Sequence, residues 1–110
     1  MSDAGVPEID VVELADRLDE GAYLLDVRTP GEYEEAHVAG AVLVPLAELS
    51  QRAGEVPTDG TVYVICQTGA RSARAAAVLR QQGLEAVNVV GGTMAWMNDD
   101  QPVVTGPAVR

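Results

Sequence analysis

The 110-residue chain contains no lysine and no phenylalanine, and it has a single cysteine, histidine and tryptophan. All seven basic residues are arginines, and 17 acidic residues outweigh them to a net charge of -10. Nucleic acids and anionic membranes bind clustered Lys and Arg, so this balance argues against both as partners. No apolar run approaches the ~20 residues of a membrane span. The first residues lack the basic and apolar regions of a secretory signal.

With one cysteine, Cys66, the chain cannot form an internal disulfide. Proteins of the reducing cytosol are usually free of disulfides, so the composition predicts a cytoplasmic location. The length falls in the commonest range for one domain. The apolar content of 47% fits a chain that folds around one core. We therefore expect one domain over residues 1–110, and we take a monomer as the default because nothing suggests an obligate interface.

The acidic charge is concentrated before residue 61. Residues 1–60 hold 14 acidic side chains and three arginines, whereas residues 61–110 hold three acidic side chains and four arginines. The segment between residues 66 and 82 has no acidic residue and three arginines, at positions 71, 74 and 80. A small anion can be drawn to such a local region even though the whole surface repels it.

Short apolar runs alternate with amphipathic segments along the chain. Strands are predicted at 23–27, 41–44, 61–65 and 86–90, and helices at 11–18, 29–37, within 46–52, from 71–72 to Gly83, and after Gly92. Asp10 and Thr29 are the expected N-caps of the first two helices, each followed by a Glu three residues later. This alternation favours an α/β domain with a mainly parallel sheet.

The strongest local feature is the β-prone segment Thr61–Ile65, which runs directly into Cys66 and a glycine-containing loop. Open α/β sheets bind ligands at the carboxyl ends of their strands. The N–H groups and dipole of the following helix form an anion site, and Gly69 lets several N–H groups converge. Arg71 adds a fork of charged donors. Because this setting lowers a thiol pKa, Cys66 is predicted to be an activated nucleophile beside an anion site rather than only a small buried residue at the end of a core strand.

Several ordered motifs resemble the rhodanese-like sulfurtransferases over about residues 9–104. They are Leu24–Arg28, Glu32–Tyr33, His37–Ala41 with Pro45, Cys66–Ser72, and Gly91–Gly92 with Trp96 and Pro102–Val103. The resemblance implies a five-stranded, mainly parallel sheet flanked by helices, which forms a single catalytic domain.

The same resemblance implies that Cys66 attacks the outer sulfur of a small anionic donor such as thiosulfate. Cys66 would hold that sulfur as a persulfide and pass it to cyanide or a thiol. The implied substrate-binding residues are Gln67, Thr68, Gly69, Ala70, Arg71 and Ser72, with Arg71 on the sulfonate part of the donor. No metal or organic cofactor is expected, because no His and Cys cluster has ligand spacing. Since the chain has no resolving thiol, the persulfide must leave to an outside acceptor, and a sulfur-relay protein is one such partner.

One position departs from the family pattern. Many members carry a basic residue directly after the catalytic cysteine, whereas this chain has Gln67. The exchange weakens the local positive field and predicts weaker thiosulfate binding. Arg71, at the sixth loop position, is similar to thiosulfate-type members rather than mercaptopyruvate-type ones.

Three other functions stay open at this point. A phosphatase or arsenate reductase needs five residues between Cys and Arg, but four separate Cys66 from Arg71. A noncatalytic interaction module commonly lacks the cysteine. A persulfide carrier that takes sulfur from another protein would use the same loop.

Outside the loop, the remaining polar and aromatic residues are given structural roles. Asp26, Arg28 and Glu32 are expected to form an ion-pair network near a strand end, and His37 is expected to pack or cap rather than to act as a base. Met94 and Trp96 are predicted to lie in the core.

Overall fold

Strands and helices alternate along residues 5–109, the part of the chain that the computed structural model describes. The strands are β1 (Glu8–Ile9), β2 (Tyr23–Asp26), β3 (His37–Val38), β4 (Val42–Leu43), β5 (Thr61–Ile65), β6 (Glu85–Val89) and β7 (Val103–Val104). The α-helices are α1 (Val11–Asp19), α2 (Pro30–Glu35), α3 (Leu49–Arg52), α4 (Ala70–Gln81) and α5 (Gly92–Asn98), and the 3-10 turns η1 (Leu46–Glu48) and η2 (Ala53–Glu55) flank α3. Within residues 5–109, no helix has the length and apolar content to cross a bilayer.

Five strands form one sheet in the order β1-β6-β5-β2-β4. Each neighbouring pair is parallel, which confirms the expected five-stranded sheet. The strands β3 and β7 form a separate antiparallel pair. The predicted strand over 61–65 agrees with β5 residue for residue, whereas β1, β3 and β7 have only two residues each and carry too little pattern to be predicted from it.

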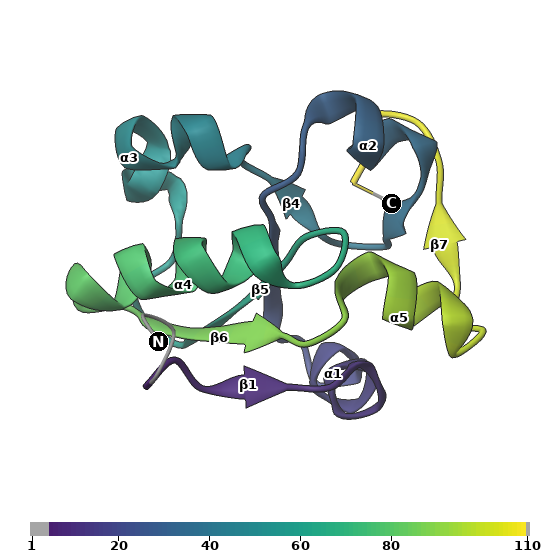
Figure 1. Ribbon diagram of the computed structural model, residues 1–110, viewed down its shortest axis with the longest axis horizontal. Coiled ribbons are helices and arrows are strands. Elements are labelled where there is room, and N and C mark those ends of the chain that lie inside the picture. The colour runs from purple at the N-terminus through teal and green to yellow at the C-terminus, as the bar shows by residue number, and fades with distance from the viewer. Residues whose placement is uncertain (1–4, 110) are drawn as a thin grey trace.

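Helices cover both faces of the sheet, with α4 alongside β5 and β6 (Figure 1). One apolar cluster joins Leu25, Val62, Val64 and Ala86 of the sheet to Leu49 of α3 and to Ala76 and Leu79 of α4. The other joins Leu24, Ile65 and Val89 to Leu14 of α1 and Trp96 of α5. Successive strand side chains point to opposite faces, so neighbours such as Leu24 and Leu25 belong to different clusters. Because β5 is covered on both faces, the residue that follows it has a fixed position.

The starts of the first helices agree with the sequence signals. The Asp10 carboxylate accepts the Glu13 N–H at 2.8 Å, and Thr29 and Glu32 form a reciprocal capping box at the start of α2. Helix α4 begins at Ala70, slightly earlier than predicted, because Gly69 turns the chain with a φ of 111°. Glycine at this cap position has no side chain that could accept the first N–H groups of α4.

His37 is fully buried and has the predicted packing role. Its ring stacks on Tyr33 with centroids 3.6 Å apart. Its two nitrogens lie 2.7 Å from the Tyr33 carbonyl oxygen and 2.8 Å from the Ala108 carbonyl oxygen. Trp96 lies in the core as predicted, but the prediction for Met94 is wrong, because its position on α5 faces solvent and it is 45% exposed.

Candidate active site

Cys66 follows β5, which lies between β6 and β2 in the sheet. The residue is 1% exposed, so it has the burial that the sequence associated with a small core residue at a strand end. Its sulfur is enclosed because the loop folds over it: the Gly69 N–H donates to Sγ at 3.0 Å and the Ser72 hydroxyl lies 3.3 Å from Sγ. Cys66 is therefore both a buried residue at a strand end and the centre of a polar cradle.

The surroundings of the sulfur favour its thiolate form. Burial raises the pKa of the Cys66 thiol, because a charge is less stable away from water. Hydrogen bonds from the Ser72 hydroxyl and from the backbone N–H groups of Ser72, Gly69 and Thr68 act in the opposite direction. Together they outweigh burial and hold the pKa of Cys66 below the ordinary value of a thiol. A lowered pKa increases the fraction of the nucleophilic thiolate.

Helix α5 explains why the N–H groups of the loop face the sulfur. The Thr93 N–H donates to the Cys66 carbonyl at 2.8 Å, and the Met94 N–H donates to the Gln67 carbonyl at 3.0 Å. In a trans peptide the C=O and N–H bonds point in opposite directions. With the Gln67 carbonyl turned toward α5, the Thr68 N–H of the same peptide is directed to the other side, where Sγ lies.

Gly92 allows this close approach between α5 and the loop. A Cβ at Gly92 would come within 2.4 Å of the Cys66 carbonyl oxygen and 2.7 Å of the Gln67 carbonyl oxygen, and its φ is +61°. Gly69 also lies close to this segment. Its φ is +111°, and a Cβ at Gly69 would lie 3.3 Å from the Gly91 nitrogen. The sequence connected Gly69 to the Cys66 loop, but it gave Gly91–Gly92 only as a motif, because only the folded chain brings Gly92 against Cys66.

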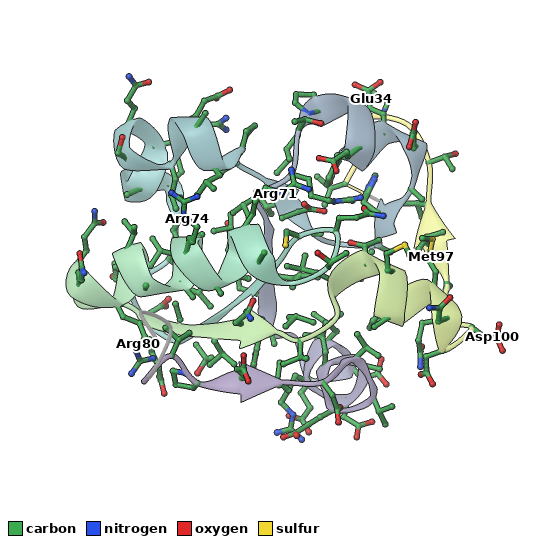
Figure 2. The ribbon with its side chains drawn as sticks, in the orientation of Figure 1. Glu34, Arg71, Arg74, Arg80, Met97 and Asp100 are labelled. Atoms are coloured by element: carbon green, nitrogen blue, oxygen red, sulfur yellow. The ribbon has the colours of Figure 1, made fainter. Side chains whose placement is uncertain are left out.

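Arg71 lies in the first turn of α4, on the side that faces α2 (Figure 2). Its guanidinium donates to both carboxylate oxygens of Glu32, at 2.8 and 2.9 Å. This bond from Arg71, more than any other influence, lowers the pKa of Glu32 to about 2. The pKa of Arg71 is raised, first by the hydrogen bond to Glu32 and more weakly by the charge of Cys66. Arg71 is thus within electrostatic reach of the sulfur, but its fork of donors is directed at a carboxylate.

Arg28 makes a second pair with a carboxylate, below the loop. It is 2% exposed and donates to Asp26 through Nε at 3.0 Å and Nη2 at 2.9 Å. Its Nη1 donates to the Gln67 side-chain oxygen at 3.0 Å. The predicted structural role of Arg28 is confirmed, but the predicted network is wrong in one respect: Glu32 pairs with Arg71 instead.

The other predicted site residues lie at the rim of the cradle. Thr68 and Ala70 are exposed, and Gln67 is half-buried with its side chain held by Arg28. Arg74 is exposed one turn further along α4 (Figure 2). Sequence reasoning missed Thr93, whose hydroxyl donates to the Cys66 carbonyl at 3.1 Å, and Asn88, which contacts Ser72.

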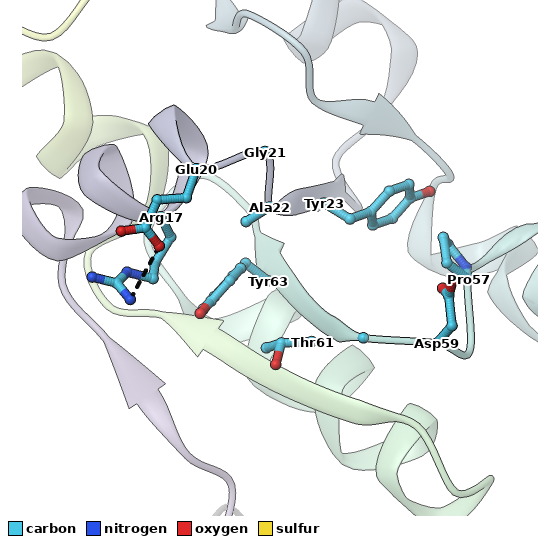
Figure 3. A pocket seen from close by; sticks show the side chains of 10 residues that line it. Arg17, Glu20, Gly21, Ala22, Tyr23, Pro57, Asp59, Thr61 and Tyr63 are labelled. Atoms are coloured by element: carbon cyan, nitrogen blue, oxygen red, sulfur yellow. Dashed lines mark ion pairs between the residues drawn. The ribbon is translucent and has the colours of Figure 1, made fainter.

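Two hollows lie at opposite ends of the sheet. One of about 320 Å³ adjoins the Arg71 side chain and is lined by Val27, Arg28, Thr29, Pro45, Leu46, Ala47 and Arg71. The other, of about 460 Å³, lies where β2 and β5 begin and contains the Arg17–Glu20 ion pair (Figure 3). Of these two hollows, the first borders the loop segment through Arg71, because Cys66 and the loop follow the carboxyl end of β5.

These features define a class: an α/β domain in which a cysteine at the end of a central parallel strand is surrounded by N–H groups at a helix start. Comparison with known proteins identifies the family. The sequence model of the rhodanese-like domain family matches residues 10–99 of this chain. The chain therefore belongs to that family.

Similar proteins include a sulfurtransferase of Allochromatium vinosum, which is 39% identical over 102 residues that cover 90% of this chain and 95% of that protein. YrkF of Bacillus subtilis, named as a candidate sulfur carrier protein, is 40% identical over 84% of this chain. The matched region is 52% of YrkF, so this chain spans about half the length of that relative. The crystal structure of a rhodanese-related protein from Thermoplasma volcanium has a TM-score of 0.85 and 34% identity, with 89% of this chain and 97% of that chain covered.

Proposed function

We propose that this protein is a sulfurtransferase in which Cys66 carries a sulfane sulfur from a donor such as thiosulfate to a thiophilic acceptor. The observation that carries the proposal is the cradle around Sγ, where the Gly69 N–H lies at 3.0 Å and the Ser72 hydroxyl at 3.3 Å. A nucleophile that is already held by hydrogen-bond donors needs no separate base. His37, buried against Tyr33, is accordingly not required for the reaction.

The proposed reaction has two steps. The Cys66 thiolate attacks the outer sulfur of thiosulfate, a new S–S bond forms, and the S–S bond of the donor breaks with its electron pair leaving on sulfite. A thiolate or cyanide then attacks the outer sulfur of the persulfide, and Cys66 leaves as a thiolate. The same N–H groups stabilise the negative charge on Cys66 before the first step and after the second.

We propose that residues 67–72 bind the donor and that Arg71 contacts its sulfonate part. The Arg71 side chain is 36% exposed and borders the hollow of about 320 Å³, so an anion in that hollow can share the Arg71 fork with Glu32. Gln67 is held by Arg28 and adds no charge to the loop.

The reducing cytosol remains the proposed compartment, since Cys66 is the only cysteine.

Three alternatives use the same fold. A persulfide carrier that receives sulfur from a protein donor is favoured by the name of YrkF, and it shares the first chemical product, a Cys66 persulfide. A phosphatase is disfavoured because Arg71 follows Cys66 after four residues and its guanidinium is bonded to Glu32. An interaction module would not need the hydrogen bonds on Sγ.

The intact mass after incubation with thiosulfate tests the proposal. We expect a gain of one sulfur that cyanide removes as thiocyanate, and no gain in Cys66→Ser. Absence of both the adduct and thiocyanate contradicts sulfur transfer from thiosulfate. An adduct formed only with a protein persulfide indicates the carrier, and Cys66-dependent hydrolysis of an aryl phosphate indicates the phosphatase.

A further inference from the structure

A buried polar contact lies behind the sulfur. Asn88 of β6 is 3% exposed, and its side-chain Oδ1 lies 2.5 Å from the Ser72 hydroxyl oxygen. That hydroxyl oxygen, itself fully buried, lies 3.3 Å from the Cys66 Sγ. The three side chains therefore form a continuous line from β6 through the first turns of α4 to the nucleophile.

Asn88 occupies a position at which an apolar residue would ordinarily be found. Ala86, two residues before it, faces the apolar cluster between the sheet and α4, and the cross-strand neighbour of Asn88 is the fully buried Val64. Asparagine is depleted in strands, and burying a carboxamide is unfavourable unless it forms hydrogen bonds. The contact with Ser72 is what offsets this cost at Asn88.

The chemistry of the two groups shows what the contact does for the sulfur. A serine hydroxyl has one proton to donate and can also accept. In the structure Oδ1 of Asn88 faces Ser72, so the hydroxyl donates to the carboxamide oxygen in this arrangement. When Cys66 is a thiolate, the Ser72 proton turns to Sγ, and the carboxamide turns over so that its Nδ2–H donates to the Ser72 oxygen. When Cys66 is a thiol, the Ser72 proton can turn to the Asn88 oxygen instead. A carboxamide serves in both states because it presents a donor and an acceptor, whereas an apolar side chain serves in neither.

We propose that Asn88 is a positioning residue that holds the Ser72 hydroxyl beside Cys66, where the Ser72 proton can turn to Sγ and stabilise the thiolate. Its importance for turnover rests on the proposed sulfurtransferase function, but its effect on the thiol does not. Ionisation of Cys66 releases its proton to solvent, and only hydrogen bonds rearrange. The charged groups around the sulfur, Arg71 on α4 with its partner Glu32 on α2 and the buried Arg28–Asp26 pair, are unchanged by substitutions at Asn88.

The test measures the pKa of Cys66 directly by the ultraviolet absorbance of the thiolate as a function of pH. Cys66 is the only cysteine, so the signal has one source, and Cys66→Ser supplies the blank. Ser72→Ala is expected to raise the pKa of Cys66 by about 1–2, the value of one hydrogen bond to a charged group. Asn88→Leu, close in shape and suited to its apolar neighbours, is expected to raise it by about half as much. In the Ser72→Ala background, Asn88→Leu is expected to change nothing further.

Leu79→Ala is the matched control. Leu79 is buried on α4 two turns after Ser72 and packs in the apolar cluster between the sheet and α4, but it has no polar group that could donate a hydrogen bond to the sulfur. The Leu79→Ala substitution is expected to lower the melting temperature of the protein and to leave the pKa of Cys66 unchanged. If Asn88→Leu does not fold, Asn88→Ala replaces it, alone and in the Ser72→Ala background, and the pKa of Cys66 is measured in the same way.

Two results would overturn the proposal: a pKa of Cys66 that is unchanged in Asn88→Leu, or an equal increase from that substitution with and without Ser72. Both can be read whether or not the protein transfers sulfur. Failure of the sulfurtransferase proposal therefore shows in the mass experiment, and failure of this one shows in the titration.

Discussion

Two guanidinium–carboxylate pairs lie at the same edge of the sheet and differ in burial. The Arg28–Asp26 pair has side chains that are 2% and 1% exposed, with a shortest N–O distance of 2.9 Å. The Arg71–Glu32 pair is 36% and 32% exposed, with a shortest N–O distance of 2.8 Å. The distances are nearly equal, so burial rather than geometry separates the two pairs.

The comparison assigns the pairs different roles. Removing one partner of a buried pair leaves an uncompensated charge in the interior, which typically costs about 3–5 kcal/mol. Exposed pairs contribute only about 0.2–1 kcal/mol, because water competes for both charges. The Arg28 pair therefore supports the fold below the loop, whereas Arg71 can exchange its partner at little cost in stability. An arginine that can change partners is suited to an anionic donor.

The largest expected effect comes from breaking the buried pair. Arg28→Met removes the partner of Asp26 and the donors to Gln67 and to the Ala36 carbonyl. We expect the free energy of unfolding, measured by urea titration, to fall by about 3–5 kcal/mol. In the Asp26→Asn background the same substitution should cost less, because no carboxylate is left unpaired. If the free energy of unfolding fell by less than about 1 kcal/mol in Arg28→Met, the buried pair would contribute no more to stability than an exposed pair.

The next effect falls on activity rather than stability. Arg71→Ala should reduce kcat/KM for thiosulfate by about tenfold to a hundredfold, since a hydrogen bond to a charged group contributes about 1.5–3 kcal/mol. The free energy of unfolding should change by no more than about 1 kcal/mol. An uncharged dialkyl trisulfide, assayed in parallel, should lose less activity. Equal losses for both donors would assign Arg71 a structural role and remove the contrast with Arg28.

The sequence predicts the local part of this site and not its partners. The strand over 61–65, the capping box of α2 and the turn at Gly69 are each encoded within a few neighbouring residues, so composition and spacing are enough to predict them. The partner of Arg71 is 39 residues away, and although the sequence places Glu32 in a capping box, nothing local shows that Glu32 pairs with Arg71. A contact of that kind depends on how α2 and α4 pack against the sheet.

The contacts of α5 with the Cys66 loop and the contact between Asn88 and Ser72 were missed for the same reason. The loop that encloses the sulfur is held by α5, whose N–H groups donate to the Cys66 and Gln67 carbonyls from more than two dozen residues further along the chain. The Asn88 side chain reaches Ser72 only because β6 lies beside β5 and under α4. A polar residue inside an apolar strand was the available signal for Asn88.

A smaller effect is expected when the exposed pair is opened from its other side. Glu32→Gln keeps the oxygen that accepts from the Thr29 N–H, so the start of α2 is retained, but it removes the charge that holds Arg71. We expect the KM for thiosulfate to fall about two- to fivefold, in line with the ~1 kcal/mol upper value of an exposed pair. The double variant Glu32→Gln with Arg71→Ala should resemble Arg71→Ala alone. An unchanged or higher KM in Glu32→Gln would show that Glu32 does not compete with the donor.

The smallest effect concerns the dependence of stability on pH. The pKa of Glu32 is lowered from 4.5 to about 2, chiefly by the hydrogen bond from Arg71. A carboxyl group whose pKa is lower in the folded state stabilises the fold above its unfolded pKa and loses that contribution as pH falls through the folded one. The free energy of unfolding should therefore fall more steeply in the native protein than in Glu32→Gln between about pH 4.5 and 2. Because the pair is about one-third exposed, the difference should stay within about 1 kcal/mol. A larger difference, or one suppressed only slightly by added salt, would mean that the Arg71 pair behaves like the buried Arg28 pair and that its partner exchange is not easy.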